Sequence, residues 1–335
     1  MSQREEKRSK AIHYVEQNSR RRRLIAGGLG LGLAGIGAAL APRLARAATR
    51  QLRIGYQKGA LSIIRAHGTL EQRLAPLGAT VKWVEFSAGP VQLEALGAGS
   101  IDFGDVGEAP PIFAQAAGTP LVYVGATVPR PYVEAVLVRE ESGISRPAQL
   151  KGKRIALNKG SNVHYFLVKL LEKHGLAYGD VTPVWLAPAD ARAAFERGSV
   201  DAWAIWEPYL AAAQQTLKAR ILADADGVVK NRAYYFSTRD YARENADLIK
   251  IALDELGRVD ELAKSRPDDY AAELATILGL PRSVLDVMVR RYTYGTLPIT
   301  HAILEEQQQI ADAFLDLKLI PRKINLRETA PPWLA

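Results

Sequence analysis

The sequence predicts an α/β fold with two similar lobes, and the first observation behind this prediction is an internal echo. Gly99–Asp102 reads Gly-Ser-Ile-Asp and is followed, after five further residues, by Glu108. The same order returns 99 residues later, where Gly198–Asp201 reads Gly-Ser-Val-Asp and is followed by Glu207. Gly-Ser-x-Asp is also ordinary turn chemistry, so the two aspartates could simply cap turns.

A second echo lies upstream of each copy. Arg53–Ala60 and Arg154–Ser161 both begin with Arg-Ile and both carry Lys-Gly before their last residue, at an offset of 101 residues. Two echoes in the same order indicate a duplicated layout, because a repeat array would need at least three copies. The third observation is that short apolar runs alternate with helical patterns, which is typical of mostly parallel sheets flanked by helices.

The elements of the first copy follow from apolar spacing and from the placement of Pro and Gly. Ser87 is a candidate N-cap, and Pro90 suits a first helical turn because its missing N–H would have no partner there. Gly97 and Gly99 then end this helix. The expected strands are 51–56, 81–86, 101–106, 121–127 and 132–139, and the expected helices are 61–75, 90–96 and one starting at 110.

The second copy begins near Leu150 and repeats this layout. Its expected strands are 154–157, 184–186, 200–205 and 233–238, its helices are 163–174, 189–197 and one opened by Pro208, and helices at 240–264, 267–278, 281–290 and 300–317 follow. We expect a discontinuous first lobe of residues 48–130 and 238–335, completed by the C-terminal helices, and a second lobe of residues 131–237. Two crossings, near 127–133 and 233–238, would form the hinge.

The first 47 residues have the character of an export signal. Arg20–Arg23 is followed by the apolar, glycine-rich run Leu24–Leu40, and Ala45–Ala47 is a small-x-small cleavage site. Arg21–Ile25 fits a twin-arginine pattern, although the general secretory route is an alternative. The 17-residue apolar run is at the lower limit for a membrane anchor. We expect residues 1–47 to be a cleaved signal and the mature protein to be soluble in the periplasm.

Composition excludes several function classes. The net charge is +8, but residues 1–47 hold ten of the 44 basic and three of the 36 acidic residues, which leaves a net charge of +1 on the remainder. The chain therefore has no basic domain for nucleic acid. It has no cysteine, and we find no Ser-His-Asp signature, metal-ligand spacing or phosphate-binding loop. We expect no catalytic residues, no cofactor and no metal.

A ligand is expected where strands end and helices begin. In open α/β sheets, ligands bind outside the carboxyl ends of the strands, and helix starts present unpaired N–H groups to small anions. Trp203 and Trp206 are candidate walls for an organic group, although each could instead belong to the core. The segments with this combination are 57–60, 87–90, 107–110, 159–162, 188–190 and 206–208.

These segments also carry a family resemblance, which rests on Tyr56–Gly59, Trp83–Pro90, Gly107–Gly118, Leu121–Gly125, Pro188–Phe195 and Val200–Tyr209. The chain resembles the periplasmic aliphatic sulfonate-binding proteins of ABC importers over nearly all of residues 51–330. The resemblance implies a type 2 periplasmic binding protein fold, which captures an alkanesulfonate in a hinged cleft and delivers it to an inner-membrane permease for sulfur supply.

The resemblance also implies the residues of the cleft. The first-lobe wall would hold Gln57, Gly89, Pro90, Gly107 and Glu108. The second-lobe wall would hold Ser161, Asn162, His164, Asp201, Trp203 and Glu207. Neutral donors would bind the sulfonate, because oriented N–H groups can supply the positive potential that an anion needs.

One stretch departs from the family pattern. Where Ser-Thr-Gly-Asp is expected after Gly104, this chain has Asp105-Val106-Gly107-Glu108. Two hydroxyls are lost and an acid appears, and an acid beside a sulfonate would repel it. Asp105 therefore points away from the ligand, pairs with a cation, or meets a ligand that also carries an amine.

The sequence is also compatible with two other functions. The protein could be a receptor for a related small acid such as taurine, nitrate or a pyrimidine precursor. It could also be an enzyme on the same fold, since fold does not fix function. Glu108 and Glu207 could then form a carboxylate pair, although each stands just before a helix-starting proline and a structural role explains both. We expect a monomer.

Overall fold

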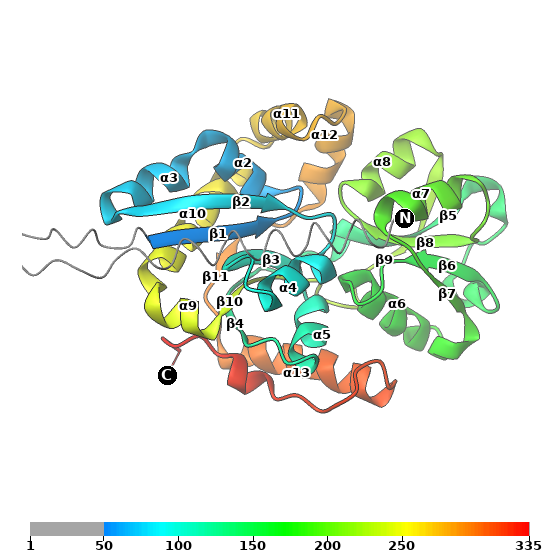
Figure 1. The fold of residues 1–335 in the computed structure, drawn as a ribbon. Helices are drawn as coiled ribbons and strands as arrows, with labels where there is room; N and C mark the ends of the chain where they lie inside the picture. The colour runs from blue at the N-terminus through cyan, green and yellow to red at the C-terminus, as the bar shows by residue number, and fades with distance from the viewer. Residues whose placement is uncertain (1–49, 335) are drawn as a thin grey trace, which may run out of the picture. The chain divides into compact units, whose positions relative to one another are not determined.

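Two mixed β-sheets, each lying between layers of helices, make up the computed structural model, which describes residues 50–334 (Figure 1). The expected signal at residues 1–47 lies outside this range. None of the helices formed by the described residues combines the length and apolar character that a bilayer crossing requires.

The first sheet has six strands in the order β11-β4-β10-β3-β1-β2. Strands β1, β2, β3 and β4 run in one direction, and β10 and β11 run in the other. The strands are β1 (Arg50–Tyr56), β2 (Ala79–Glu85), β3 (Phe103–Gly107), β4 (Leu121–Thr127), β10 (Ala233–Thr238) and β11 (Thr296–Leu297).

The second sheet has five strands in the order β7-β6-β8-β5-β9, and β5 alone runs against the others. Most strands of each sheet therefore point the same way, as expected, but the inserted strands β10 and β5 make both sheets mixed. The strands are β5 (Glu134–Arg139), β6 (Arg154–Leu157), β7 (Thr182–Trp185), β8 (Ala202–Trp206) and β9 (Ala219–Asp224).

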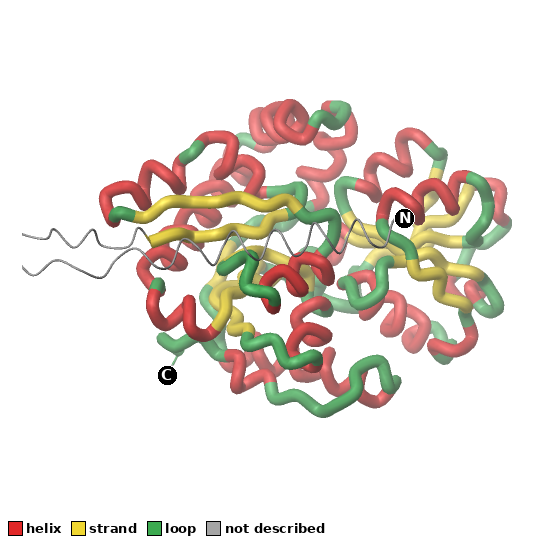
Figure 2. The backbone as a smooth tube through the Cα atoms, viewed as in Figure 1, coloured by secondary structure: helices red, strands yellow, loops and turns green. Residues whose placement is uncertain are grey.

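Helices cover both faces of the first sheet (Figure 2). Successive side chains of a strand point to opposite faces, so Leu52 and Ile54 of β1 pack toward one layer, while Tyr234 and Phe236 of β10 pack toward the other. The first layer holds α2 (Ala60–His67), α3 (Thr69–Leu74), α9 (Arg239–Glu244), α10 (Ala246–Ser265), α11 (Pro267–Leu278) and α12 (Arg282–Arg291). The second layer holds α4 (Gly89–Gly97), α5 (Pro110–Ala116) and α13 (His301–Asp316).

The second sheet follows the same rule with fewer helices. Ala202 and Ala204 of β8 face α6 (Asn162–Lys173), whereas Trp203 and Ile205 face the opposite layer. That layer is formed by α7 (Pro188–Glu196) and α8 (Tyr209–Thr216).

The observed elements differ from expectation at a few points. The helix expected over 61–75 is split by Gly68, whose φ of 62° lies in the left-handed region that favours glycine. The helix expected over 240–264 is split at Asn245. Ala88, not Ser87, precedes α4 as its N-cap. Strand β9 was missed because it carries Arg220 and Asp224 and lacks a clean apolar alternation.

Two chain crossings join the lobes. Residues 128–133 lead from β4 to β5, and residues 225–232 lead from β9 to β10. The second crossing therefore precedes 233–238, because those residues form β10 and pair with β3 and β4 in the first sheet. The crossings are bonded to each other: Arg130 N donates to the Lys230 carbonyl at 3.0 Å, and Asn231 Nδ2 donates to the Arg130 carbonyl at 3.1 Å.

The duplicated Gly-Ser-x-Asp pattern has a structural role. Asp102 accepts a hydrogen bond from Arg53 N at 2.9 Å, and Asp201 accepts one from Arg154 N at 2.8 Å. Each aspartate N–H returns a bond to the carbonyl of the same arginine, at 2.7 and 2.8 Å. In both lobes the aspartate thus bonds the start of its own strand, β3 or β8, to the parallel strand beside it.

Candidate ligand-binding site

A cavity of about 350 Å³ lies between the lobes, at the carboxyl ends of their parallel strands. This is the edge where open α/β sheets collect ligands. Strand β1 is followed by Gln57 and Lys58, β4 is followed by Arg130, and β8 ends at Trp206. The remaining lining residues are Glu85, Phe86, Ser87, Gly89, Asp105, Val106, Gly107, Pro110, Val133, Ser161, Asn162, Glu207, Pro208, Tyr209, Asn231, Arg232, Ala233 and Tyr292.

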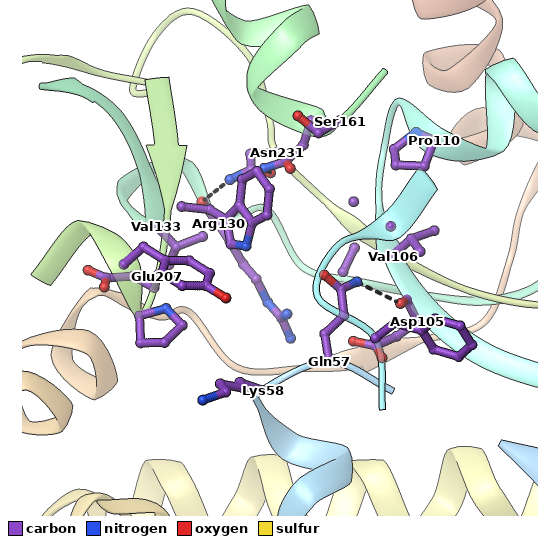
Figure 3. A pocket seen from close by; sticks show the side chains of 18 of the residues that line it. Gln57, Lys58, Asp105, Val106, Pro110, Arg130, Val133, Ser161, Glu207 and Asn231 are labelled. Atoms are coloured by element: carbon purple, nitrogen blue, oxygen red, sulfur yellow. Dashed lines mark hydrogen bonds between the residues drawn. The ribbon is translucent and has the colours of Figure 1, made fainter. Parts of the chain in front are cut away.

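Arg130 brings a positive charge into this cavity (Figure 3). Its guanidinium carbon lies 5.2 Å from the centre of the Tyr292 ring, and its Nε donates to the Thr293 carbonyl at 3.3 Å. Within residues 50–334 no carboxylate forms an ion pair with Arg130. The guanidinium is therefore held in place from one side and keeps its two Nη groups for an anion.

Helix starts add further donors around the cavity. Helices α4, α6 and α8 begin at or beside lining residues, whereas α5 begins with Pro110 and Pro111, which have no N–H. The first N–H groups of a helix have no intrahelical partner and carry the positive end of its dipole. The backbone N–H groups at these helix starts are the neutral donors that the resemblance implies. The Arg130 guanidinium is a charged donor that the resemblance does not imply.

Aromatic rings form an apolar wall. The rings of Trp206 and Tyr209 meet edge to face, with centroids 6.2 Å apart. Phe86 and Tyr292 also line the cavity. Such rings suit the hydrocarbon part of a small organic ligand.

The lobes approach closely beside the cavity. A Cβ atom added at Gly107 would lie 2.7 Å from Cβ of Asn162, which belongs to the opposite lobe. Asn162 Nδ2 in turn donates to Glu134 Oε2 at 2.5 Å. Glycine at position 107 therefore permits the contact between α6 and the end of β3.

Three carboxyl groups near the cavity are deeply buried. Burial raises the pKa of Glu108 to about 8, and it raises the pKa of Glu134 well above its usual value. Burial also raises the pKa of Glu207, whose two oxygens accept bonds from Ala211 N and from Arg291 of the first lobe, at 3.0 and 2.5 Å. Glu207 thus links the lobes and has its charge compensated within the protein.

Seven of the twelve residues expected at the site line the cavity. They are Gln57, Gly89, Asp105, Gly107, Ser161, Asn162 and Glu207. Pro90 lies one position beyond the lining, in the first turn of α4.

The other four expected residues lie outside the lining for identifiable reasons. Glu108 is buried, and its Oε2 accepts a bond from Arg232 N at 3.3 Å. Asp201 lies at the amino end of its sheet. Trp203 is a mid-strand residue with no exposed surface, packed under α7 against Phe195.

His164 is a packing residue between the lobes. Its Nδ1 accepts a bond from Gly160 N at 3.2 Å, so the neutral ring donates from Nε2 to the Tyr178 hydroxyl at 2.9 Å. Burial lowers its pKa to about 4. Its ring stacks on Phe113 and contacts Phe314, both from the first lobe.

Sequence reasoning missed Arg130, Asn231, Tyr209 and Tyr292. Arg130 stands in the Pro129–Pro131 crossing, where the sequence predicts only a hinge. Tyr292 follows α12, and no local pattern places a residue from that part of the chain at the cleft. Tyr209 follows the Trp206-Glu207-Pro208 run and could have been found from that strand end.

Comparison with known proteins agrees with this geometry. Residues 78–269 match the NMT1/THI5-like family. A relative from Escherichia coli K12, described as a candidate aliphatic sulfonates-binding protein, is 42% identical over 287 residues, which are 85% of this chain and 89% of the relative. The taurine-binding periplasmic protein of the same organism is 27% identical over 250 residues, 69% of this chain and 77% of that protein.

A solved structure shows the same similarity. The alkanesulfonate-binding protein SsuA from Xanthomonas axonopodis pv. citri, bound to MOPS, superposes with a TM-score of 0.81 at 40% identity. The match covers 85% of this chain and 98% of that one. The chain therefore belongs to the NMT1/THI5-like family and, within it, to the aliphatic sulfonate-binding proteins of ABC importers.

Proposed function

We propose that this protein captures aliphatic sulfonates in the interlobe cavity and delivers them to an ABC permease for sulfur acquisition. The observation that carries the proposal is the guanidinium of Arg130, which forms no ion pair within residues 50–334 and lines a cavity with an aromatic wall. A sulfonate needs such donors, and its alkyl chain needs an apolar surface. The relatives, which are solute-binding proteins and not enzymes, support the same function.

The ligand contacts both lobes in this proposal. Gln57, Gly89 and Gly107 bind from the first lobe, and Ser161 and Asn162 bind from the second. Contacts to both lobes favour a closed state over an open one, with rotation at the two crossings. Small-angle scattering should show a smaller radius of gyration with ligand, and an unchanged radius would contradict closure.

A thermal-shift titration tests the function directly. Pentanesulfonate should raise the melting temperature in a concentration-dependent way, because a ligand that binds the folded state stabilises it. Pentanol, which lacks the sulfonate, is the matched control and should give no shift. No shift with any alkanesulfonate, or sulfite release during incubation, would refute the proposal.

The export route is part of the proposal. The twin-arginine signal is cleaved after Ala47, so the periplasmic protein begins at Ala48. In this proposal the periplasmic protein is also a monomer. Support comes from the Arg21–Ile25 pattern and from the periplasmic relatives. N-terminal sequencing of the periplasmic protein and light scattering test these statements. An N-terminus upstream of Leu24 or a stable dimer would contradict them.

A further inference from the structure

Asp105 places a carboxyl group in the cavity without a partner. Its Oδ1 is buried and has no hydrogen-bond partner among the described residues. The backbone carbonyl of Asp105, by contrast, accepts a bond from Gln57 Nε2 at 3.4 Å. A buried acceptor left unbonded is costly, so this oxygen is suited to a donor that arrives with the ligand.

The protein offers Asp105 no ion pair of its own. Within residues 50–334, neither Arg130 nor Lys58 lies within ion-pair distance of this carboxyl, although the Arg130 charge acts on it. Tyr235 of β10 is its partner in the sheet register, and Tyr292 also lies near enough to interact. Both phenols stay neutral at pH 7, because burial raises the pKa of Tyr292 to about 12 and that of Tyr235 above its usual value.

The charge state of Asp105 depends on burial. Burial raises its pKa to about 6, and the positive charge of Arg130 opposes this rise. At pH 7 and above, the group is therefore mostly ionised. An ionised carboxylate repels a simple sulfonate, and salt screens a buried carboxylate less than an exposed one.

We propose that this cavity selects sulfonates that also carry an ammonium group, with the ammonium bound at Asp105 and the sulfonate at Arg130. The inference rests on the proposed function and narrows its substrate class. Opposite charges on the ligand then meet opposite charges on the protein, and the unpaired Oδ1 gains a donor. Charge-assisted hydrogen bonds of this kind are stronger than neutral ones.

The test compares two ligands that differ in one group. 3-Aminopropanesulfonate and propanesulfonate are titrated calorimetrically into the purified protein at pH 7.5. The wild type should bind the amine-bearing ligand roughly tenfold or more tightly. Asp105→Asn should abolish this preference, and Glu94→Gln should keep it. Glu94 is the matched control because it is an exposed carboxylate on α4 that does not line the cavity.

A pH series adds a second readout. Lowering the pH from 7.5 to 5 protonates Asp105 and should weaken binding of 3-aminopropanesulfonate while strengthening binding of propanesulfonate. The inference is overturned if wild type binds propanesulfonate as tightly as the amine at pH 7.5, or if Asp105→Asn keeps the preference. Failure of both ligands and of longer alkanesulfonates to bind would refute the proposed function instead.

Discussion

Removing the guanidinium of Arg130 should weaken sulfonate binding more than any other single change at the cavity. Arg130→Met keeps an unbranched apolar stem against Tyr292 and removes the charge. The Nε of Arg130 already donates to the Thr293 carbonyl, so the two Nη groups of Arg130 remain for the ligand. Hydrogen bonds to charged groups contribute about 1.5–3 kcal/mol each.

The expected loss follows from these bonds. Two bonds would give about 3–6 kcal/mol, and the helix starts that remain recover part of this, which leaves about 2–4 kcal/mol. At about 1.4 kcal/mol per tenfold change, affinity should fall roughly 30- to 1000-fold.

Calorimetric titration with pentanesulfonate measures this loss. The matched control is Lys58→Met, because Lys58 also lines the cavity and forms no ion pair within residues 50–334. Ordering a lysine costs up to about 2 kcal/mol of side-chain entropy, so this change should alter affinity by less than about threefold. If Arg130→Met retains affinity within threefold and folds normally, neutral donors hold the sulfonate and the role assigned to Arg130 is wrong.

Three further predictions concern residues around the cavity. Trp206→Ala should weaken ligand binding with little loss of stability, whereas Trp203→Ala should cost about 3–5 kcal/mol of unfolding free energy, because Trp203 is fully buried. Calorimetry measures the affinity of each variant and denaturant unfolding measures its stability. A stability loss in Trp206→Ala together with an affinity loss in Trp203→Ala would contradict this assignment. Asp102→Ala and Asp201→Ala should each lower the unfolding free energy by about 1–3 kcal/mol without changing ligand affinity. A loss of affinity in Asp201→Ala would show that Asp201 belongs to the binding site. Burial raises the pKa of Glu108 in the folded state from 4.5 to about 8. Between these values the folded state keeps a proton that the unfolded state loses, so the unfolding free energy should fall as pH rises from 5 to 8. Urea denaturation of Glu108→Gln should show a weaker dependence of the unfolding free energy on pH, and an unchanged dependence would contradict the assignment.

Local sequence determined most elements of this fold. Strand 121–127 and helix 267–278 form over the expected residues. The spacing of apolar residues, prolines at helix starts and glycines at helix ends are local signals. They can be recognised from nearby residues alone, without knowing which distant segments pack against them. The two echoes also indicate a duplicated layout. The equivalent hydrogen bonds of Asp102 and Asp201 explain the Gly-Ser-x-Asp echo, because the aspartate has the same structural role in both lobes.

The tertiary structure decided which of these residues reach the cavity. Trp203 and Trp206 are three positions apart on one strand, yet the first faces a helix layer and the second ends the strand at the cleft. Arg130 meets Tyr292 and Asn231 across more than 100 residues of sequence, because two crossings and the end of α12 converge there. Strand ends and helix starts can be found from local sequence, but the orientation of a side chain and its charged neighbours depend on how distant segments pack.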